Sequence, residues 1–183
     1  MSISVQFGGA RLVQCTEEQH APQILEILNE AIVNSTAVYD YKPRPASSMG
    51  PWFRTKVASN FPVLGAEGEN GQLLGFATYG AFRAWPAYKY TVEHSVYVRH
   101  DVRGRGIGKL LLSNLIEAAR ERDVHVLVAG IDASNGASIS LHERHGFRHA
   151  GTVRECGFKF DRWLDLSFYQ LMLSTPAHPV GDE

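Results

Sequence analysis

The sequence predicts an α/β protein in which helices flank a twisted, mixed, mostly antiparallel sheet. Short segments rich in β-branched and other apolar residues recur along the 183-residue chain and predict strands. Segments whose apolar residues recur at helical spacing lie between some of them. Their order is strand, helix, helix, three strands, helix, strand, helix and two strands, which predicts one mixed sheet with helices packed on it.

The first third of the chain predicts one strand and two helices. Residues 10–15 have the composition of a short strand, and the following Thr16-Glu17-Glu18-Gln19 is a capping box that begins a helix. Prolines within 42–45 break this helix, and a second one is expected over about 46–59. The first helix has one apolar face, formed by Ile24, Ile27, Leu28, Ala31 and Ile32.

The middle of the chain predicts three consecutive strands. Segments 61–67 and 73–81 flank Asn70-Gly71, which is a strong hairpin signal. An aromatic loop at 82–90 then leads to a strand at 91–98 that is rich in β-branched residues.

The last part predicts two helices and three strands. Glycines within 103–108 open an amphipathic helix, and the near-continuous apolar segment 125–131 predicts a buried strand. A short helix over 135–145 ends at Gly146, because glycine commonly terminates helices. Two final strands are expected at 147–155 and 162–173.

Composition favours one globular domain, expected over 1–174, with a loose C-terminal tail at 175–183. The net charge is −1, so no global basic field attracts nucleic acid or an anionic membrane. No apolar run reaches the roughly 18 residues of a membrane-spanning helix, and the N-terminal segment lacks the features of a secretory signal. Cys15 and Cys156 make no disulfide framework, and both are expected to be buried structural thiols of a cytoplasmic protein.

A glycine-rich turn is the clearest functional motif. Arg103-Gly104-Arg105-Gly106-Ile107-Gly108-Lys109 joins a strand to an amphipathic helix, where free backbone N–H groups and the helix dipole favour an anion. Because Arg103 and Leu110 stand where a nucleotide-binding P-loop needs glycine and Ser or Thr, that motif is excluded. The glycine spacing also differs from the dinucleotide fingerprint. The turn therefore predicts a pyrophosphate cradle of another kind.

This turn, as R-x-x-G-x-G, resembles the acetyl-coenzyme A motif of the GNAT N-acetyltransferases. Residues 135–147 resemble the second motif of that family, N-x-x-A-x-x-L-Y-x-x-x-G-F. Residues 29–39, 91–98 and 157–166 resemble the phosphinothricin and methionine sulfoximine acetyltransferase subgroup. The resemblance implies the GNAT fold, acetyl-CoA as co-substrate, and acetylation of the α-amino group of small glutamate or methionine analogues by a homodimer.

Glu93 is the candidate general base, since a carboxylate in a mostly apolar strand needs a partner or a function. The alternative is a structural ion pair with a neighbouring arginine. His142 stands where many GNAT enzymes carry the tyrosine that protonates the leaving thiolate, and histidine can also donate a proton. The alternative for His142 is a surface position. Transfer is expected to be direct, without a covalent enzyme intermediate.

The remaining candidates concern the two substrates. Asn135 and Ser138 share a helix face with His142 and could contact the cofactor, although Asn135 could also be a simple N-cap. The strand residues Val96, Tyr97 and Val98 are expected to pair with the pantetheine arm like an added strand. The amino-acid site is predicted to use a cation for the carboxylate and aromatic walls around a closed pocket. Its candidates are Arg83, Trp85, Tyr88, Tyr39 and Lys159.

Other functions stay open at this point. The enzyme could acetylate protein N-termini or polyamines, or the chain could be a non-catalytic CoA-binding regulatory module. A metal site is not expected: His142, His145 and His149 have ligand-like spacing, but Gly146 should end the helix between them.

Overall fold

The computed structural model describes residues 6–7 and 9–181, and within them it contains four α-helices and an eight-stranded sheet. The helices are α1 Glu17–Asn34, α2 Met49–Ala58, α3 Ile107–Arg120 and α4 Gly136–Arg144. The strands are β1 Gln6–Phe7, β2 Ala10–Gln14, β3 Val63–Gly68, β4 Leu73–Ala81, β5 Thr91–Val98, β6 Val126–Asp132, β7 Arg148–Lys159 and β8 Arg162–Met172.

The sheet is mixed and mostly antiparallel, as predicted. Its strand order is β1-β2-β3-β4-β5-β6-β8-β7. β5 pairs parallel with β6. The pairs β2–β3, β3–β4, β6–β8 and β7–β8 are antiparallel. The predicted order of strands and helices is confirmed, with the short β1 as an addition. β7 continues to Lys159 instead of ending near 155, because Phe160 and Asp161, both with positive φ, close a tight hairpin into β8.

The chain divides into two compact units: the first comprises residues up to Thr78 together with Val96–Leu115, and the second comprises Tyr79–Ser95 and the residues from Ile116 onward. β4, β5 and α3 each contribute residues to both. The predicted single domain over 1–174 stays a prediction.

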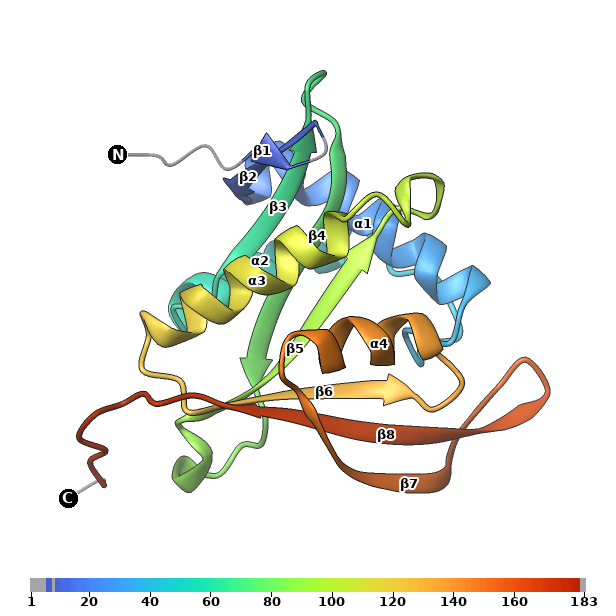
Figure 1. Ribbon diagram of the computed structural model, residues 1–183. Helices are drawn as coiled ribbons and strands as arrows, with labels where there is room; N and C mark the ends of the chain where they lie inside the picture. The colour runs from blue at the N-terminus through green and yellow to red at the C-terminus, as the bar shows by residue number, and fades with distance from the viewer. Residues whose placement is uncertain (1–5, 8, 182–183) are drawn as a thin grey trace. The chain divides into compact units, whose positions relative to one another are not determined.

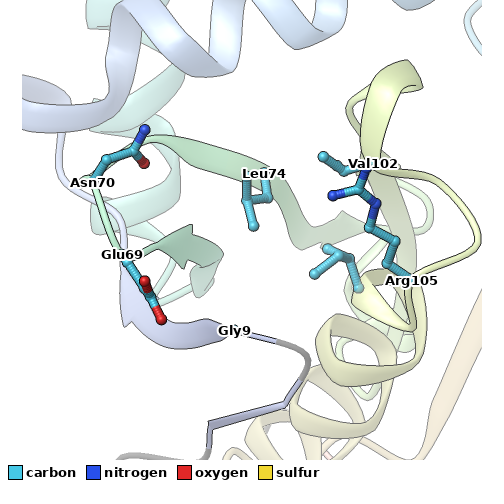
Figure 2. Close-up of a pocket in the computed structure, with 7 residues that line it drawn as sticks. Gly9, Glu69, Asn70, Leu74, Val102 and Arg105 are labelled. Carbon is cyan, nitrogen blue, oxygen red and sulfur yellow. The ribbon is translucent and has the colours of Figure 1, made fainter.

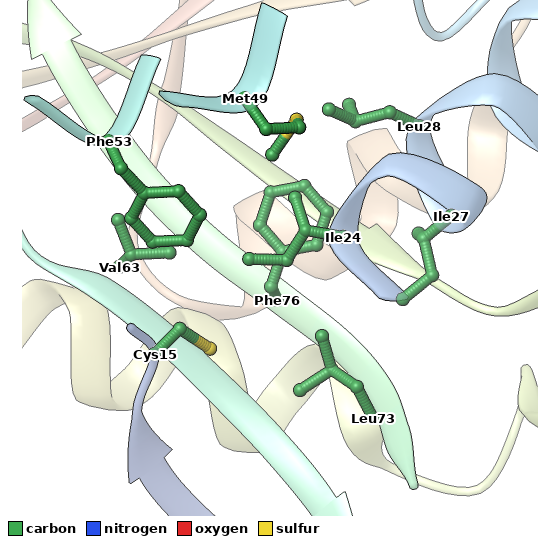
Figure 3. Close-up of a cluster of buried hydrophobic side chains, with 9 residues drawn as sticks. All are labelled: Cys15, Ile24, Ile27, Leu28, Met49, Phe53, Val63, Leu73 and Phe76. Atoms are coloured by element: carbon green, nitrogen blue, oxygen red, sulfur yellow. The ribbon is translucent and has the colours of Figure 1, made fainter. Parts of the chain in front are cut away.

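The first unit is built on β2, β3 and β4, with the apolar faces of α1 and α2 packed against β3 and β4. Thr16 caps α1 by accepting a hydrogen bond from the Gln19 N–H, so the predicted helix start is confirmed. The Thr16 N–H donates to His20 Nδ1 at 3.0 Å instead of to the Gln19 side chain, so the reciprocal half of the capping box is wrong. Phe76 lies in the middle of the shared core (Figure 3). The buried members of this core are Cys15, Ile24, Ile27, Leu28, Met49, Phe53, Val63, Leu73 and Phe76.

The start of α3 packs closely on β4 at Gly75. A Cβ at this glycine would lie 2.6 Å from the Tyr97 carbonyl oxygen and 3.2 Å from Leu111 Cδ1. Only a residue without a side chain therefore allows β4, the end of β5 and α3 to approach one another this closely.

The second unit is built on β6, which lies between β5 and β8, with β7 on the outer side of β8 (Figure 1). Glu93 pairs with Val128 across β5–β6, and Gly130 pairs with Phe168 across β6–β8. α4 packs on this sheet through contacts of His142 with β5, so the loop and helix that carry the second sequence motif are fixed to the strand of Glu93.

The described part of the C-terminal segment 175–181 makes hydrogen bonds with the second unit. Thr175 Oγ1 donates to the Val124 carbonyl at 2.5 Å, and the Val180 N–H donates to the Tyr90 hydroxyl at 3.0 Å. Among the described residues, none of the helices combines the length and the apolar character that crossing a bilayer requires.

Candidate active site

The glycine turn of the first unit has the backbone geometry of an anion cradle. Gly104 and Gly106 have φ values of 78° and 83°, in the left-handed region that glycine adopts without steric cost. The Gly106 carbonyl accepts the first helical hydrogen bond, from the Leu110 N–H at 3.0 Å. The preceding N–H groups at the start of α3 have no partner within the helix and lie at the positive end of its dipole. The binding of a phosphate at this turn stays a prediction.

The arginines of the turn have different surroundings. Arg103 donates from Nε to the Val98 carbonyl at 3.2 Å, and its guanidinium lies 3.5 Å from the Glu30 carboxylate. Arg105 donates to the Asp101 carbonyl at 3.5 Å and borders a surface hollow of about 410 Å³ (Figure 2). Glu69 and Asn70 of the β3–β4 hairpin form the opposite wall of this hollow. Arg103 thus anchors the turn, and Arg105 supplies positive charge at the surface.

The second half of β5 lies directly before this turn. The Tyr97 ring packs at 5.3 Å from the Phe76 ring and belongs to the core formed with α1 and α2. Because side chains alternate along a strand, Val96 and Val98 point to the opposite face. Tyr97 can therefore contribute only its backbone to the pantetheine pairing predicted for 96–98.

Glu93, in the first half of β5, is half-buried in the second unit. Its Oε1 atom lies 3.2 Å from the position that a Cβ would take at Gly130 of β6, and Leu166 and Phe168 of β8 lie within 3.8 Å of the same position. Burial raises the pKa of Glu93 above its ordinary value, and the positive charge of Arg83 partly counteracts this. A carboxylate with a raised pKa is a better proton acceptor, which is the property that a general base needs.

His142 contacts a second histidine, His94, that the sequence analysis did not single out. Their Nε2 atoms lie 2.9 Å apart, and the two residues are only 4% and 5% exposed. Both rings also lie 5.1 Å from the Phe147 ring. His142 is therefore not a surface residue, and that alternative is wrong. Strand alternation could have indicated His94, because it shares the face of the buried Val92.

The hydrogen bonds define where the protons of this pair lie. His142 Nδ1 lies 2.7 Å from the Ser138 carbonyl oxygen, which can only accept, so Nδ1 carries a proton. In the neutral pair, His142 Nε2 then accepts, and His94 Nε2 donates the single proton between the rings. Burial lowers the pKa of both histidines, that of His94 to about 3, with the neighbouring His142 as the second cause. The pair is therefore neutral near pH 7.

Asn135 and Ser138 lie at the start of α4. The Asn135 Oδ1 atom accepts a hydrogen bond from the Ser138 N–H at 3.1 Å, so the N-cap interpretation of Asn135 is confirmed. The Ser138 hydroxyl lies 3.5 Å from His142 Nδ1. Their contacts with a cofactor stay a prediction.

Four side chains of the loop 82–90 lie close to one another. They are Phe82, Arg83, Trp85 and Tyr88. The Arg83 guanidinium stacks 4.1 Å from the Phe82 ring centre and donates to the Phe82 carbonyl at 2.7 Å. The Tyr88 ring lies 5.6 Å from Phe82 and 6.4 Å from Trp85. Trp85 is 66% exposed and Tyr88 is 41% exposed, so these rings form an open cluster rather than the walls of a closed pocket. The structure nevertheless brings Arg83 close enough to Glu93 for its charge to act on the carboxylate.

The other two candidates have different environments. Lys159 is only 4% exposed, and its ammonium lies 5.0 Å from the Phe160 ring at the β7–β8 turn. Tyr39 belongs to the first unit and is 37% exposed. Their part in substrate binding stays a prediction.

The cysteines differ in accessibility. Cys15 is buried, and burial, with the Glu67 charge as a second cause, raises the pKa of its thiol to about 12. Cys156 is exposed, so the expected buried position is wrong. The register of β7 against β8 shifts between Val153 and Gly157, which disrupts the alternation of faces. Within residues 6–7 and 9–181, no three His, Cys, Asp or Glu side chains are grouped as metal ligands would be.

Residues 23–147 match the Acetyltransferase (GNAT) family. The chain belongs to this family. Among its relatives, the L-methionine sulfoximine/L-methionine sulfone acetyltransferase of Pseudomonas aeruginosa is 47% identical over 152 residues, which cover 83% of this chain and 88% of the relative. The resemblance to the GNAT N-acetyltransferases, and to their phosphinothricin and methionine sulfoximine subgroup, is thereby confirmed.

Solved structures also confirm the GNAT fold. A candidate acetyltransferase from Acinetobacter baylyi is 62% identical, with a TM-score of 0.93 over 94% of this chain and 97% of the other. A phosphinothricin acetyltransferase from Sinorhizobium meliloti, solved in complex with acetyl-CoA, is 33% identical, with a TM-score of 0.89 over 95% of this chain and 94% of the other.

Proposed function

We propose that this GNAT enzyme transfers the acetyl group of acetyl-CoA directly to the α-amino group of a small amino acid. The expected acceptors are methionine sulfoximine, methionine sulfone and phosphinothricin, which appear in the names of relatives from Pseudomonas aeruginosa and Sinorhizobium meliloti. The observation in this chain that best supports the proposal is the half-buried Glu93 carboxylate, whose pKa is raised by burial and partly lowered by the charge of Arg83.

This pair of opposite charges suits an amino acid. Arg83 lies at the exposed aromatic loop and can bind a carboxylate with two parallel hydrogen bonds. Glu93 lies among apolar side chains, where it can accept a proton from the α-ammonium group. Trp85 and Tyr88 supply apolar surface for the acceptor side chain. A polyamine has no carboxylate, so it would leave Arg83 without a role.

The turn 103–109 fits the diphosphate of acetyl-CoA, since two positive-φ glycines precede a helix start that is rich in unpaired N–H groups. Residues 96–98, Asn135 and Ser138 are the further residues proposed to hold this co-substrate. When bound, acetyl-CoA supplies the thioester that is the source of the acetyl group. No metal is part of the proposal.

The proton chemistry is assigned to two side chains. Glu93 accepts the proton that the α-ammonium must lose to become nucleophilic, either directly or through a water molecule. His142 is the proposed proton donor and holds a proton at Nδ1. The neutral pair must first take up one proton from solvent, which leaves His94 protonated at Nδ1 and His142 protonated at both ring nitrogens, and His142 can then donate from Nε2.

The test is the release of CoA thiol from acetyl-CoA with a panel of amines. Turnover with methionine sulfone, methionine sulfoximine or phosphinothricin, together with the loss of turnover for their decarboxylated analogues, supports the proposal. Preference for peptide N-termini or for spermidine contradicts it. Tight acetyl-CoA binding without turnover of any amine would identify a non-catalytic CoA-binding protein.

A homodimer is proposed to form through the apolar surface of the β7–β8 hairpin. Phe158, Phe160 and Trp163 are 44%, 52% and 61% exposed there, and burial of such side chains drives association. Light scattering should give twice the chain mass for the wild type and the chain mass for Trp163→Glu. A cytoplasmic location stays a prediction.

A further inference from the structure

The position of the Glu93 carboxylate depends on a glycine of the neighbouring strand. Gly130 lies in β6, two residues beyond Val128, the partner of Glu93 in the parallel β5–β6 register. Residues two apart on a strand share a face, so Gly130 lies on the face of the Glu93 side chain. A Cβ built at Gly130 would lie 3.2 Å from Glu93 Oε1. This is closer than an ordinary van der Waals contact.

The backbone does not explain this glycine. Its φ lies outside the left-handed region, so any residue could adopt its conformation. Glycine inside a strand is destabilising relative to alanine, and it commonly marks a place where another group approaches closely. The group that approaches here is the carboxylate.

Two side chains of β8 also border the space that a Gly130 side chain would occupy. The Cβ position lies 3.5 Å from Leu166 Cδ1 and 3.8 Å from Phe168 Cε1. The Glu93 carboxylate and these two apolar side chains thus border the position that a Gly130 side chain would take. An alanine would fill the remaining space and press on Oε1, because Leu166 and Phe168 leave little room for the methyl group to move.

We infer that Gly130 is a positioning residue for the acetyl transfer, because its missing side chain provides the space in which the Glu93 carboxylate is held. This inference rests on the proposed role of Glu93 as the base. Gly130 is proposed to act through Glu93 and not by contact with either substrate. A displacement of the carboxylate by a few tenths of an ångström disturbs its alignment with the acceptor amine, and such errors are costly in oriented reactions.

The first test is Gly130→Ala, with folding checked by thermal unfolding. We expect kcat to fall about 3–10-fold, since a full 1 Å misplacement costs about 100-fold. The KM values for both substrates should change less than about two-fold, because Arg83 and the glycine turn are untouched. The matched control is Gly68→Ala: this strand glycine also has an ordinary φ, and its Cβ would meet nothing closer than 3.4 Å. Its kinetics should equal those of the wild type.

The pH profile separates positioning from a general structural effect. The groups around Glu93 are the Arg83 cation, Gly130 and Val128 of β6, and Leu166 and Phe168 of β8, so Arg83 is the one charged group among these neighbours. The alanine methyl removes water from Oε1, which should move the acidic limb of kcat/KM to higher pH. Gly130→Ser instead brings a hydroxyl donor to the carboxylate and should move the same limb to lower pH.

A double-mutant comparison completes the design. In Glu93→Asp the shorter side chain withdraws from the Gly130 position, so Gly130→Ala should cost less than about two-fold in that background. Two outcomes would overturn the inference while Glu93→Gln still has a low kcat/KM. The first is a folded Gly130→Ala variant with wild-type kcat and an unmoved acidic limb of kcat/KM. The second is an equal shift of this limb in Gly130→Ala and Gly130→Ser. Full activity of Glu93→Gln would overturn the proposed base and the inference together.

Discussion

The buried His94–His142 pair should make the stability of the protein fall steeply at mildly acidic pH. Both histidines have a lowered pKa in the folded protein, that of His94 to about 3 from an ordinary value of 6.5. A histidine with a lowered pKa contributes stability that is fully present above its ordinary pKa and is lost as the pH falls toward the folded value. For His94 the window runs from about pH 6.5 down to about 3.

The magnitude follows from the protons taken up on unfolding. Each proton bound only by the unfolded chain reduces the free energy of unfolding by about 1.4 kcal/mol per pH unit. Between pH 7.5 and 5.5 an unfolded histidine passes from mostly neutral to mostly charged, whereas His94 stays neutral in the folded protein. His94 alone therefore removes about 1.4 kcal/mol over this interval, and His142, whose pKa is also lowered by burial, adds to this loss.

The assay is urea unfolding of the wild type and of His94→Gln/His142→Gln at pH 7.5, 6.5 and 5.5. Two side-chain amides can still hydrogen-bond to each other, but they do not titrate. The double variant should be less stable at pH 7.5 and should lose at least about 1.4 kcal/mol less between pH 7.5 and 5.5. His178→Gln, at an exposed position of the C-terminal segment, is the control and should follow the wild type. Equal pH dependence of the wild type and the double variant would refute the assignment of a neutral buried pair.

Three further predictions concern catalysis. Gly106→Val places a β-branched residue at a φ of 83°, so the turn should distort and the KM for acetyl-CoA should rise; normal acetyl-CoA binding by the folded variant would place the site elsewhere. Arg83→Ala should raise the KM for the amino acid and leave acetyl-CoA affinity nearly unchanged, and an equal loss of both would indicate a folding defect. Glu93→Gln should lower kcat/KM by about 10²–10⁴-fold, remove the acidic limb, and retain a rate that climbs at alkaline pH; full activity below neutral pH would exclude Glu93 as the base.

Local features of the fold were accessible from the sequence because they depend on neighbouring residues. The helical spacing at 24, 27, 28, 31 and 32 identified residues that are all less than 5% exposed in the structure. Thr16 caps α1, and the Asn70-Gly71 turn has the positive φ that its glycine allows, 76°. Each of these signals spans only a few residues, so no tertiary contact is needed to interpret it.

The parts that escaped prediction depend on contacts between distant residues. His94 and His142 are 48 positions apart, and only the packing of α4 on β5 brings their rings together. The space for the Glu93 carboxylate comes from three strands, because Gly130 and Phe168 become neighbours only through the β6–β8 register. Cys156 lies within the register shift of β7 between Val153 and Gly157, where Glu155 has a φ of 51°. The alternation of apolar and polar residues in the sequence does not show such an irregularity, so the exposure of Cys156 could not be predicted.

The contrast between the two cysteines matters for the measurement of activity itself. Thiol-reactive dyes that detect released CoA also react with accessible protein thiols, and the reactive species is the thiolate. Cys15, buried and with a pKa of about 12, should be silent in such an assay, whereas the exposed Cys156 should react. The folded enzyme should therefore contribute a fixed blank of one equivalent per chain, rising to two in denaturant. A maleimide fluorophore should likewise attach at a single place, on the β7–β8 hairpin, and report on any chain that packs against it.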